Sequence, residues 1–508
     1  MRALVIVCML LGCEIDNSPP PMVEVEVKVE ETTSELTTTT ITNPSMLAGV
    51  ERVRGHLIIA TSGAVRLPDL VVVEGDLRIV GTEARPVYVD LDLPKLGRVG
   101  GNIELGWTTA TARLTATKLT SLGGHLEVFS GEWALALPLL TSINGDLRAH
   151  DGTFVQVDLG SLKTVGGSIR VDDVKLARGL VIDLGALESV GGHITARDST
   201  LFIEASRLLS VGGDLTFEGG EASLGLDGLR EVLGDLRFEH VTATKLALSS
   251  LRTVGDDLVY DHVAGAELAA LEFYALTDIG GDLRVVAVEG LEAVTLSELA
   301  RVGGDLVVEG SPTLAELNCL VLSEIDGALV MQDGADFTAA LYQVVSVGGD
   351  LIVANHTSFV GGFQELTDVG GDLRITSTSM AFTGMQDVAD IGGDLELADI
   401  TGTDQFDELR FDRLRSLGGA LSLSGTRSVE KFVMPTLLSV GNIDGGDLVI
   451  RDNLHLSSIA FTELTAVTGE LLVRDNPALP TSEILSQLGD VPSSATLMCG
   501  NLGDDLCQ

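Results

Sequence analysis

Apolar residues recur along this chain at a nearly constant distance. The unit is a leucine or isoleucine that is usually followed two residues later by a second apolar side chain, as in Leu351 and Val353. Alternation with a period of two places both side chains on one face of a β-strand. The first and last of 19 such anchors are 414 residues apart, which gives a mean spacing of 23 residues. The anchors are Leu57, Leu77, Ile103, Leu126, Leu147, Ile169, Ile194, Leu215, Leu236, Leu258, Leu283, Leu306, Leu329, Leu351, Leu373, Leu395, Leu421, Leu448 and Leu471.

A glycine pair precedes most anchors, as in V-G-G-D-L from Val347 to Leu351. Because glycine readily adopts positive φ values, we expect the pair to form a sharp turn before each strand. A repeat of 23 residues is too short for the two helices of a helical repeat, and the leucine-rich repeat signature does not recur regularly. The pattern therefore predicts an all-β solenoid over residues 46–480, with about 19 coils of roughly 23 residues whose strands stack into parallel sheets.

The last two coils carry a longer pattern, G-x-L-x-I followed by N-x-x-L. It is formed by Gly446, Leu448, Ile450, Asn453 and Leu456, and again by Gly469, Leu471, Val473, Asn476 and Leu479. This pattern resembles the receptor L-domain, a β-helical module of growth-factor and insulin receptor ectodomains that is also found in fungal cell-wall proteins and bacterial surface lipoproteins. The resemblance covers about residues 46–508 and implies a right-handed parallel β-helix. Most earlier coils lack the asparagine, so the resemblance does not imply receptor function.

The N-terminus reads MRALVIVCMLLGC. Arg2, the apolar run and L-L-G-C resemble the signal peptide and lipobox of bacterial lipoproteins, in which the cysteine is acylated after cleavage. We therefore predict a signal peptide over residues 1–12, lipid attachment at Cys13, and a disordered tether rich in Thr, Pro and Glu over residues 13–45. The lipid would anchor the protein to a membrane of the bacterial cell envelope, at the outer membrane or cell surface. The alternative is a chance apolar N-terminus.

Residues 481–508 are expected to cap the solenoid. A short helix with Thr or Ser as its N-cap should end at Gly489. Cys499 and Cys507 follow, and in an exported chain we expect them to form a disulfide. Cys319 has no such partner and is expected to be a buried apolar residue.

Composition narrows the possible partners. The chain has 74 acidic and 32 basic residues and a formal net charge of −42, which excludes nucleic acid as a partner because phosphates would be repelled. In many coils an aspartate directly precedes the anchor, and a row of such carboxylates could bind Ca²⁺. In other coils this position is occupied by His56, Ser168 or Ala328. This variation favours carboxylates that hydrogen-bond the backbone, so we predict no metal and no cofactor. These aspartates are Asp76, Asp146, Asp214, Asp235, Asp257, Asp282, Asp305, Asp350, Asp372, Asp394 and Asp447.

Nothing in the sequence indicates catalysis, because the histidines are scattered and no catalytic motif occurs. Trp107 and Trp133 could stack on a sugar. The leading prediction is a non-catalytic, lipid-anchored surface rod for adhesion or recognition of a protein or glycan. The alternatives are a β-helical polysaccharide-active enzyme and a purely structural envelope protein. Long spacings between anchors mark two candidate binding loops, residues 81–93 and 404–416.

Overall fold

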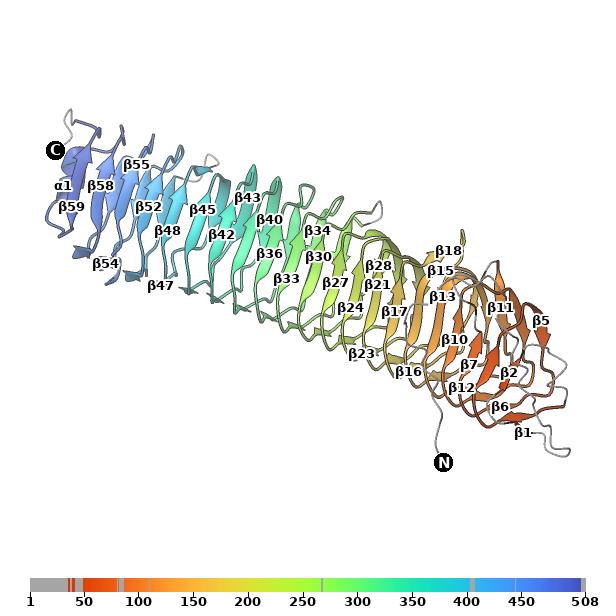
Figure 1. Ribbon diagram of the computed structural model, residues 1–508. Coiled ribbons are helices and arrows are strands. Elements are labelled where there is room, and N and C mark those ends of the chain that lie inside the picture. Colours follow the sequence, from red (N-terminus) through yellow and green to blue (C-terminus); the bar gives the residue numbers. More distant parts are fainter. Residues whose placement is uncertain are drawn as a thin grey trace, which may run out of the picture.

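The computed structural model shows a rod of stacked coils (Figure 1). About 20 turns of roughly 22 residues follow one another along it. The described part of the chain contains 59 strands and one helix, which confirms the predicted all-β solenoid. The structure describes residues 35–36, 39–41, 49–79, 81, 86–108, 110–265, 268–402, 407–443 and 445–503, with the backbone alone at residues 35–36, 39, 41 and 381–383.

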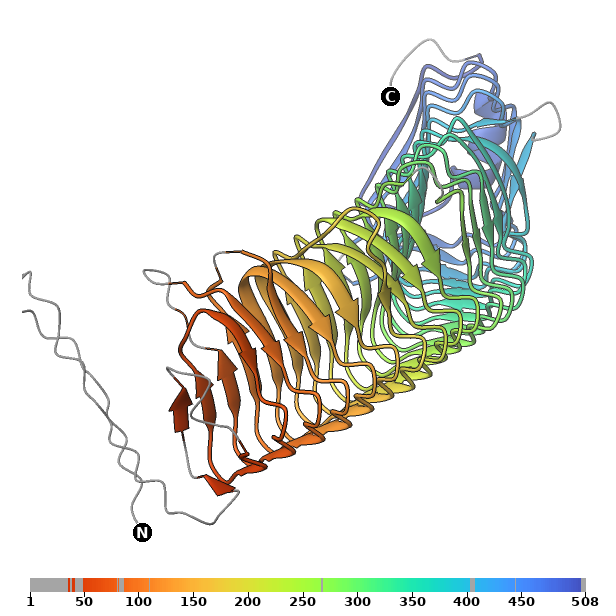
Figure 2. The ribbon, with the colours of Figure 1, turned by 90° about the vertical axis from the view of Figure 1, so that its right-hand side faces the viewer.

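Each complete coil has three faces, which the coil that begins at Leu351 illustrates. Strand β42 (Leu351–Ala354) lies in a 25-stranded parallel main sheet, and β44 (Asp368–Val369) lies in a 20-stranded second sheet. Between them, β43 (Ser358–Gly362) lies on the third face. Neighbouring coils pair in parallel and in register, so that Leu351 lies beside Leu373 and the coils stack along the rod (Figure 2).

The third face is less continuous than the other two. After the N-terminal coils it is divided into sheets of four, seven and three strands. The first division lies between β28 (Thr242–Ala247) and β31 (Ala270–Glu272), and the second between β49 (Thr401–Gly402) and β50 (Glu408–Arg410). Both divisions lie at coils that are longer than average, and the main sheet stays in register across them.

One hydrophobic core runs through the rod. In the same coil Leu351, Val353 and Phe359 are fully buried and Val369 is 2% exposed, so all three faces contribute side chains to it. The anchor and the second apolar residue therefore share one face of the strand, as predicted, and that face points into the core. Burial of such apolar area is the main favourable term in folding.

The solenoid extends beyond both predicted ends. Strand β2 (Thr39–Ile41) pairs with β4 (Leu57–Ile59), so regular pairing begins inside the expected tether of residues 13–45. Strand β59 (Ala495–Cys499) pairs with the strand before it and adds a further rung inside the expected cap of residues 481–508. The apolar repeat is weak in both segments, which is why the pattern did not include them.

The expected helix is present as α1 (Thr481–Leu488), and it ends at Gly489. Its N-cap is Pro480 instead of a threonine or serine, and no side chain caps it. The hydroxyl of Thr481 donates to the carbonyl of Leu502 instead. The Thr481 hydroxyl therefore bonds to a neighbouring segment and does not cap the helix.

The glycine pair has a different role from the one we expected. Gly370 and Gly371, like most pairs in the described coils, do not have positive φ values. A Cβ atom on Gly371 would lie 2.1 Å from Oδ1 of Asp350, and one on Gly370 would lie 2.1 Å from the carbonyl oxygen of Gly348. Glycine is required because successive coils approach too closely at this corner for a side chain.

Positive φ values occur at a different corner, directly after most of the main-sheet strands that begin at an anchor. Asn355, Ser377, Asp399 and Gly425 have φ values of 58°, 51°, 54° and 66°. Glycine, asparagine and aspartate adopt this left-handed conformation at the lowest cost. We call this corner the left-handed corner.

Candidate functional site

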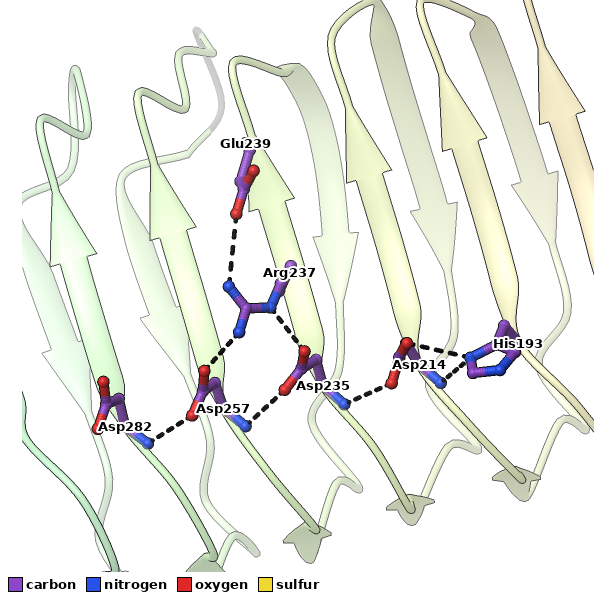
Figure 3. Close-up of polar contacts among 7 residues, drawn as sticks. All are labelled: His193, Asp214, Asp235, Arg237, Glu239, Asp257 and Asp282. Carbon is purple, nitrogen blue, oxygen red and sulfur yellow. Dashed lines mark hydrogen bonds and ion pairs between the residues drawn. The ribbon is translucent and has the colours of Figure 1, made fainter.

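The aspartates that follow the glycine pairs form a ladder along the main sheet (Figure 3). Oδ1 of Asp214 accepts a hydrogen bond from the backbone N–H of Asp235 at 3.1 Å. Asp235 accepts in the same way from Asp257, and Asp257 from Asp282, at 3.0 and 2.9 Å. Nδ1 of His193 accepts from the N–H of Asp214 at 2.9 Å. Each side chain thus holds the backbone of the next coil.

The ladder accounts for the residues that replace aspartate. Asn102, His125 and Ser168 accept the same hydrogen bond from the next coil. The backbone N–H groups of Ala328 and Ala420 donate to the aspartate of the preceding coil, but their methyl side chains cannot accept a hydrogen bond from the next coil. The expected backbone hydrogen bond is therefore present, but it joins neighbouring coils and does not close a turn within one coil.

Arginines on the outer face use the remaining carboxylate oxygens. Arg237 donates to Asp235 at 2.8 Å and also pairs with Asp257. The hydrogen bond to Asp235 raises the pKa of Arg237. Burial raises the pKa of the Asp146 carboxyl, but the N–H of Ser168 and the adjacent arginine outweigh burial and hold this pKa below its ordinary value. Among the described residues, no group of three or more His, Cys, Asp or Glu could hold a metal ion.

The asparagines of the receptor L-domain-like pattern form a second, buried ladder. Asn453 and Asn476 are fully buried, and Asn501 is 4% exposed. Oδ1 of Asn476 accepts from the backbone N–H and the side-chain Nδ2 of Asn453, at 3.1 and 3.0 Å. Oδ1 of Asn501 accepts the equivalent hydrogen bonds from Asn476. These residues hold the last coils together and are not available to a ligand.

The two tryptophans do not form a joint platform. Trp133 is 1% exposed and lies in the core. Trp107 is half-buried and contacts the edge of Phe129, which stacks on His150. Cys319 is buried as expected, and burial raises the pKa of its thiol to about 12.

The two candidate loops largely belong to regular turns of the solenoid. In residues 81–93, Val89–Asp92 forms strand β8. In residues 404–416, Glu408–Arg410 forms β50, where Arg410 pairs with Glu408 at 2.9 Å. The inserted residues 82–85 and 403–406 lie outside the described part of the chain.

The predicted covalent sites fall mostly outside the described residues. Cys13 and Cys507 are both in this category, as are the signal peptide and most of the tether. Cys499 is disulfide-bonded, and its pairing with Cys507 stays a prediction. No helix in the described part of the chain is long and apolar enough to cross a membrane.

An open polar groove of about 640 Å³ lies along the left-handed corner of four successive coils. Two columns of outward side chains form its walls, because residues four and six positions after an anchor project outward on either side of an inward residue. The first column is Asn355, Ser377, Asp399 and Gly425, the second is Thr357, Ser379, Thr401 and Arg427, and His356 and Thr378 lie between them. We call this groove the corner trough.

Several polar groups of the corner trough are not used by the fold. Asn355 donates to Asp333 at 2.8 Å, and Thr357 donates to Asp336 at 3.0 Å. The side chains of the next coils differ, because within the described residues they have no hydrogen bond or ion pair with the protein. This set comprises Ser377, Ser379, Asp399, Thr401 and Arg427.

His356 lies beside the trough and is 4% exposed. Its ring stacks on Phe337 with centroids 5.4 Å apart, and its Nε2 lies 3.1 Å from the carbonyl oxygen of Met331. Nε2 must carry the proton in order to donate to this carbonyl, and Nδ1 has no partner. Burial lowers the pKa of His356.

The residues of the corner trough are about 22 positions apart and form no local motif, so the sequence does not predict this groove. The signal that was present is a short pattern four positions after successive anchors: N-x-T, S-x-S, D-x-T and G-x-R. No family model matches the chain, and no curated protein matches it.

Proposed function

We propose that this protein is a non-catalytic, lipid-anchored rod of the bacterial cell surface that serves adhesion or partner recognition. The observation that carries the proposal is the corner trough, an open surface groove in which five polar side chains, of Ser377, Ser379, Asp399, Thr401 and Arg427, are not used by the fold. Polar groups that stabilise a fold are normally paired within it. A row of exposed, unpaired groups on a rigid scaffold is instead available to a partner.

Binding fits this site better than hydrolysis does. Glycoside hydrolysis commonly uses two carboxyl groups on either side of the scissile bond. The lining of the corner trough includes one carboxylate, Asp399. Two cavities of about 60 and 30 Å³ are lined by apolar surface and lie in the core, so they do not offer a polar cleft for chemistry. A polar pocket of about 270 Å³ contains Asp390 and Asp412, but Asp412 is already paired with Arg410 at 2.7 Å.

The test uses the full-length protein reconstituted in lipid vesicles. Vesicles that carry the wild-type protein should adhere to cell-envelope preparations. Adhesion should be lost with Cys13→Ala, because the protein then remains in the aqueous phase, and with the trough variant Asp399→Asn/Arg427→Ala. Equal adhesion by vesicles with and without protein would refute the proposal, and so would release of reducing sugar from a polysaccharide panel.

A further inference from the structure

The backbone of the corner trough is occupied by hydrogen bonds between coils. The N–H groups of Asn355, Ser377 and Asp399 donate to carbonyl oxygens of the following coil at 3.1, 2.9 and 2.8 Å. On the other wall, the N–H groups of Ser379 and Thr401 donate to the preceding coil. A peptide that binds by strand addition needs a free sheet edge. A ligand of the corner trough must therefore be recognised by side chains.

The lining also lacks apolar anchors. It consists of Asn, Ser, Thr, Asp, Arg, Gly and one His, without a Leu, Ile, Val, Phe, Tyr or Trp. Protein partners and amphipathic helices obtain most of their binding energy from large side chains buried in apolar pockets. The composition of the corner trough favours a ligand that is itself polar along its whole length.

The free groups specify the chemistry of that ligand. The carboxylate of Asp399 can only accept hydrogen bonds, and the guanidinium of Arg427 can only donate them. The hydroxyls of Ser377, Ser379 and Thr401 can do both. A ligand that satisfies all of them must present donors and acceptors close together on every side. The hydroxyl groups of a sugar chain have this property, since each one is both donor and acceptor.

Charge narrows the class of ligand further. The opposite charges of Asp399 and Arg427 leave the trough lining with no net charge, while the whole chain carries a formal charge of −42. An anionic glycan would be repelled by the surrounding field. A cation would find one carboxylate in the trough, and the described residues hold no cluster suited to a metal.

We propose that the corner trough binds an uncharged oligosaccharide that lies along the rod axis. Four coils about 4.8 Å apart give the site a length of about 14 Å. Asp399 accepts from sugar hydroxyls, Arg427 donates to hydroxyl or ring oxygens, and the Ser and Thr hydroxyls bridge the two. This inference rests on the proposed recognition function and specifies its ligand.

The rod contains a matched control for the acidic residue. Asp399 has a φ value of 54°, and a Cβ on Gly425 would lie 2.3 Å from its Oδ1. Asp198 has a φ value of 46°, and a Cβ on Gly219 would lie 2.4 Å from its Oδ1. Both are exposed residues of the left-handed corner in the same local environment, but Asp198 is not part of the trough.

The experiment measures binding of the detergent-solubilised full-length protein to uncharged tetrasaccharides of glucose, mannose and N-acetylglucosamine by calorimetry. At least one should bind, and Asp399→Asn/Arg427→Ala should weaken its affinity at least tenfold. Thr401→Val, which removes one hydroxyl at nearly constant shape, should weaken it several-fold. Arg252 is an exposed arginine outside the trough and serves as the control for Arg427. Asp198→Asn/Arg252→Ala should bind like the wild type, and circular dichroism checks that all variants are folded.

Three results would overturn the inference. Equal affinity in the wild type and the folded trough variants would place the sugar site elsewhere. No binding to any tetrasaccharide, combined with vesicle adhesion that still requires Asp399 and Arg427, would reject the ligand class and leave the recognition function standing. Adhesion that survives periodate oxidation of the envelope glycans but is abolished by protease would identify a protein partner instead.

Discussion

Replacing Gly371 by alanine tests the account of the glycine pair. The new Cβ would lie 2.1 Å from Oδ1 of Asp350, which accepts the Asp372 N–H at 2.8 Å. Gly349 is the same position one coil earlier, and the residue that faces it from the preceding coil is Ala328 instead of an aspartate. A Cβ added at Gly349 would meet only backbone atoms, Cα included, at 2.9 to 3.2 Å. The backbone contacts of the two sites are nearly equal, so the variants differ mainly in the carboxylate.

The magnitudes follow from this difference. Crowding against the backbone should cost both variants about 1–3 kcal/mol. Gly371→Ala also displaces the Asp350 carboxylate and leaves the Asp372 N–H without its acceptor, which adds about 1–3 kcal/mol. In an Asp350→Ala background that extra cost should vanish, so the double-mutant cycle should give a coupling energy of about 1–3 kcal/mol.

The assay must report on one coil, because long repeat arrays need not unfold as a single unit. Hydrogen–deuterium exchange of peptides that cover residues 366–380 gives the local opening free energy, and urea unfolding gives the global one. Equal costs for Gly371→Ala and Gly349→Ala, or no rescue by Asp350→Ala, would refute the steric and hydrogen-bond explanation.

Three further predictions concern the core, pH and the C-terminus. Leu373→Asp should cost several kcal/mol, about 3 or more, because it buries an unpaired charge, whereas Val360→Asp, at a position that is 42% exposed, should change the urea midpoint little. His356 has a lowered pKa in the folded protein, so the unfolded chain binds the proton first as the pH falls below about 6.5. The stability advantage of the wild type over His356→Gln should therefore shrink between pH 8 and pH 5, and a constant urea difference would contradict this. Non-reducing peptide mapping should recover Cys499 linked to Cys507; another partner would show that pairing to be wrong.

The main sheet could be predicted because its signal is local and repeats many times. Leu351 and Val353 are two residues apart and both buried, and the same spacing recurs in coil after coil. The third face gave no such signal, since its strands vary in length and composition. Its register is set by pairing with the neighbouring coil, about 22 residues away, and not by the local sequence.

The glycine pair shows where a residue type alone is ambiguous. Glycine can be required for a positive φ value or for close approach of another chain segment. The sequence contains Gly370 and Gly371 in either case, and only the position of Asp350 in the preceding coil distinguishes the two reasons. Positive φ values occur instead at Asn355, Ser377 and Asp399. These residues are polar, so the pattern of apolar positions does not predict the left-handed corner.

The divided third face has a mechanical consequence. The main and second sheets run along the rod in unbroken order, and their inter-coil hydrogen bonds resist extension on those two sides. The third face is interrupted between β28 and β31 and again between β49 and β50. Hydrogen bonds still join the coils at both interruptions, but fewer residues are paired there than elsewhere on this face. Under a lateral load the rod should therefore bend most easily at these two places, with the continuous sheets as the stiff side. The second interruption lies within the coil of Asp399 itself, so tension on a bound ligand would act at the more compliant part of the rod.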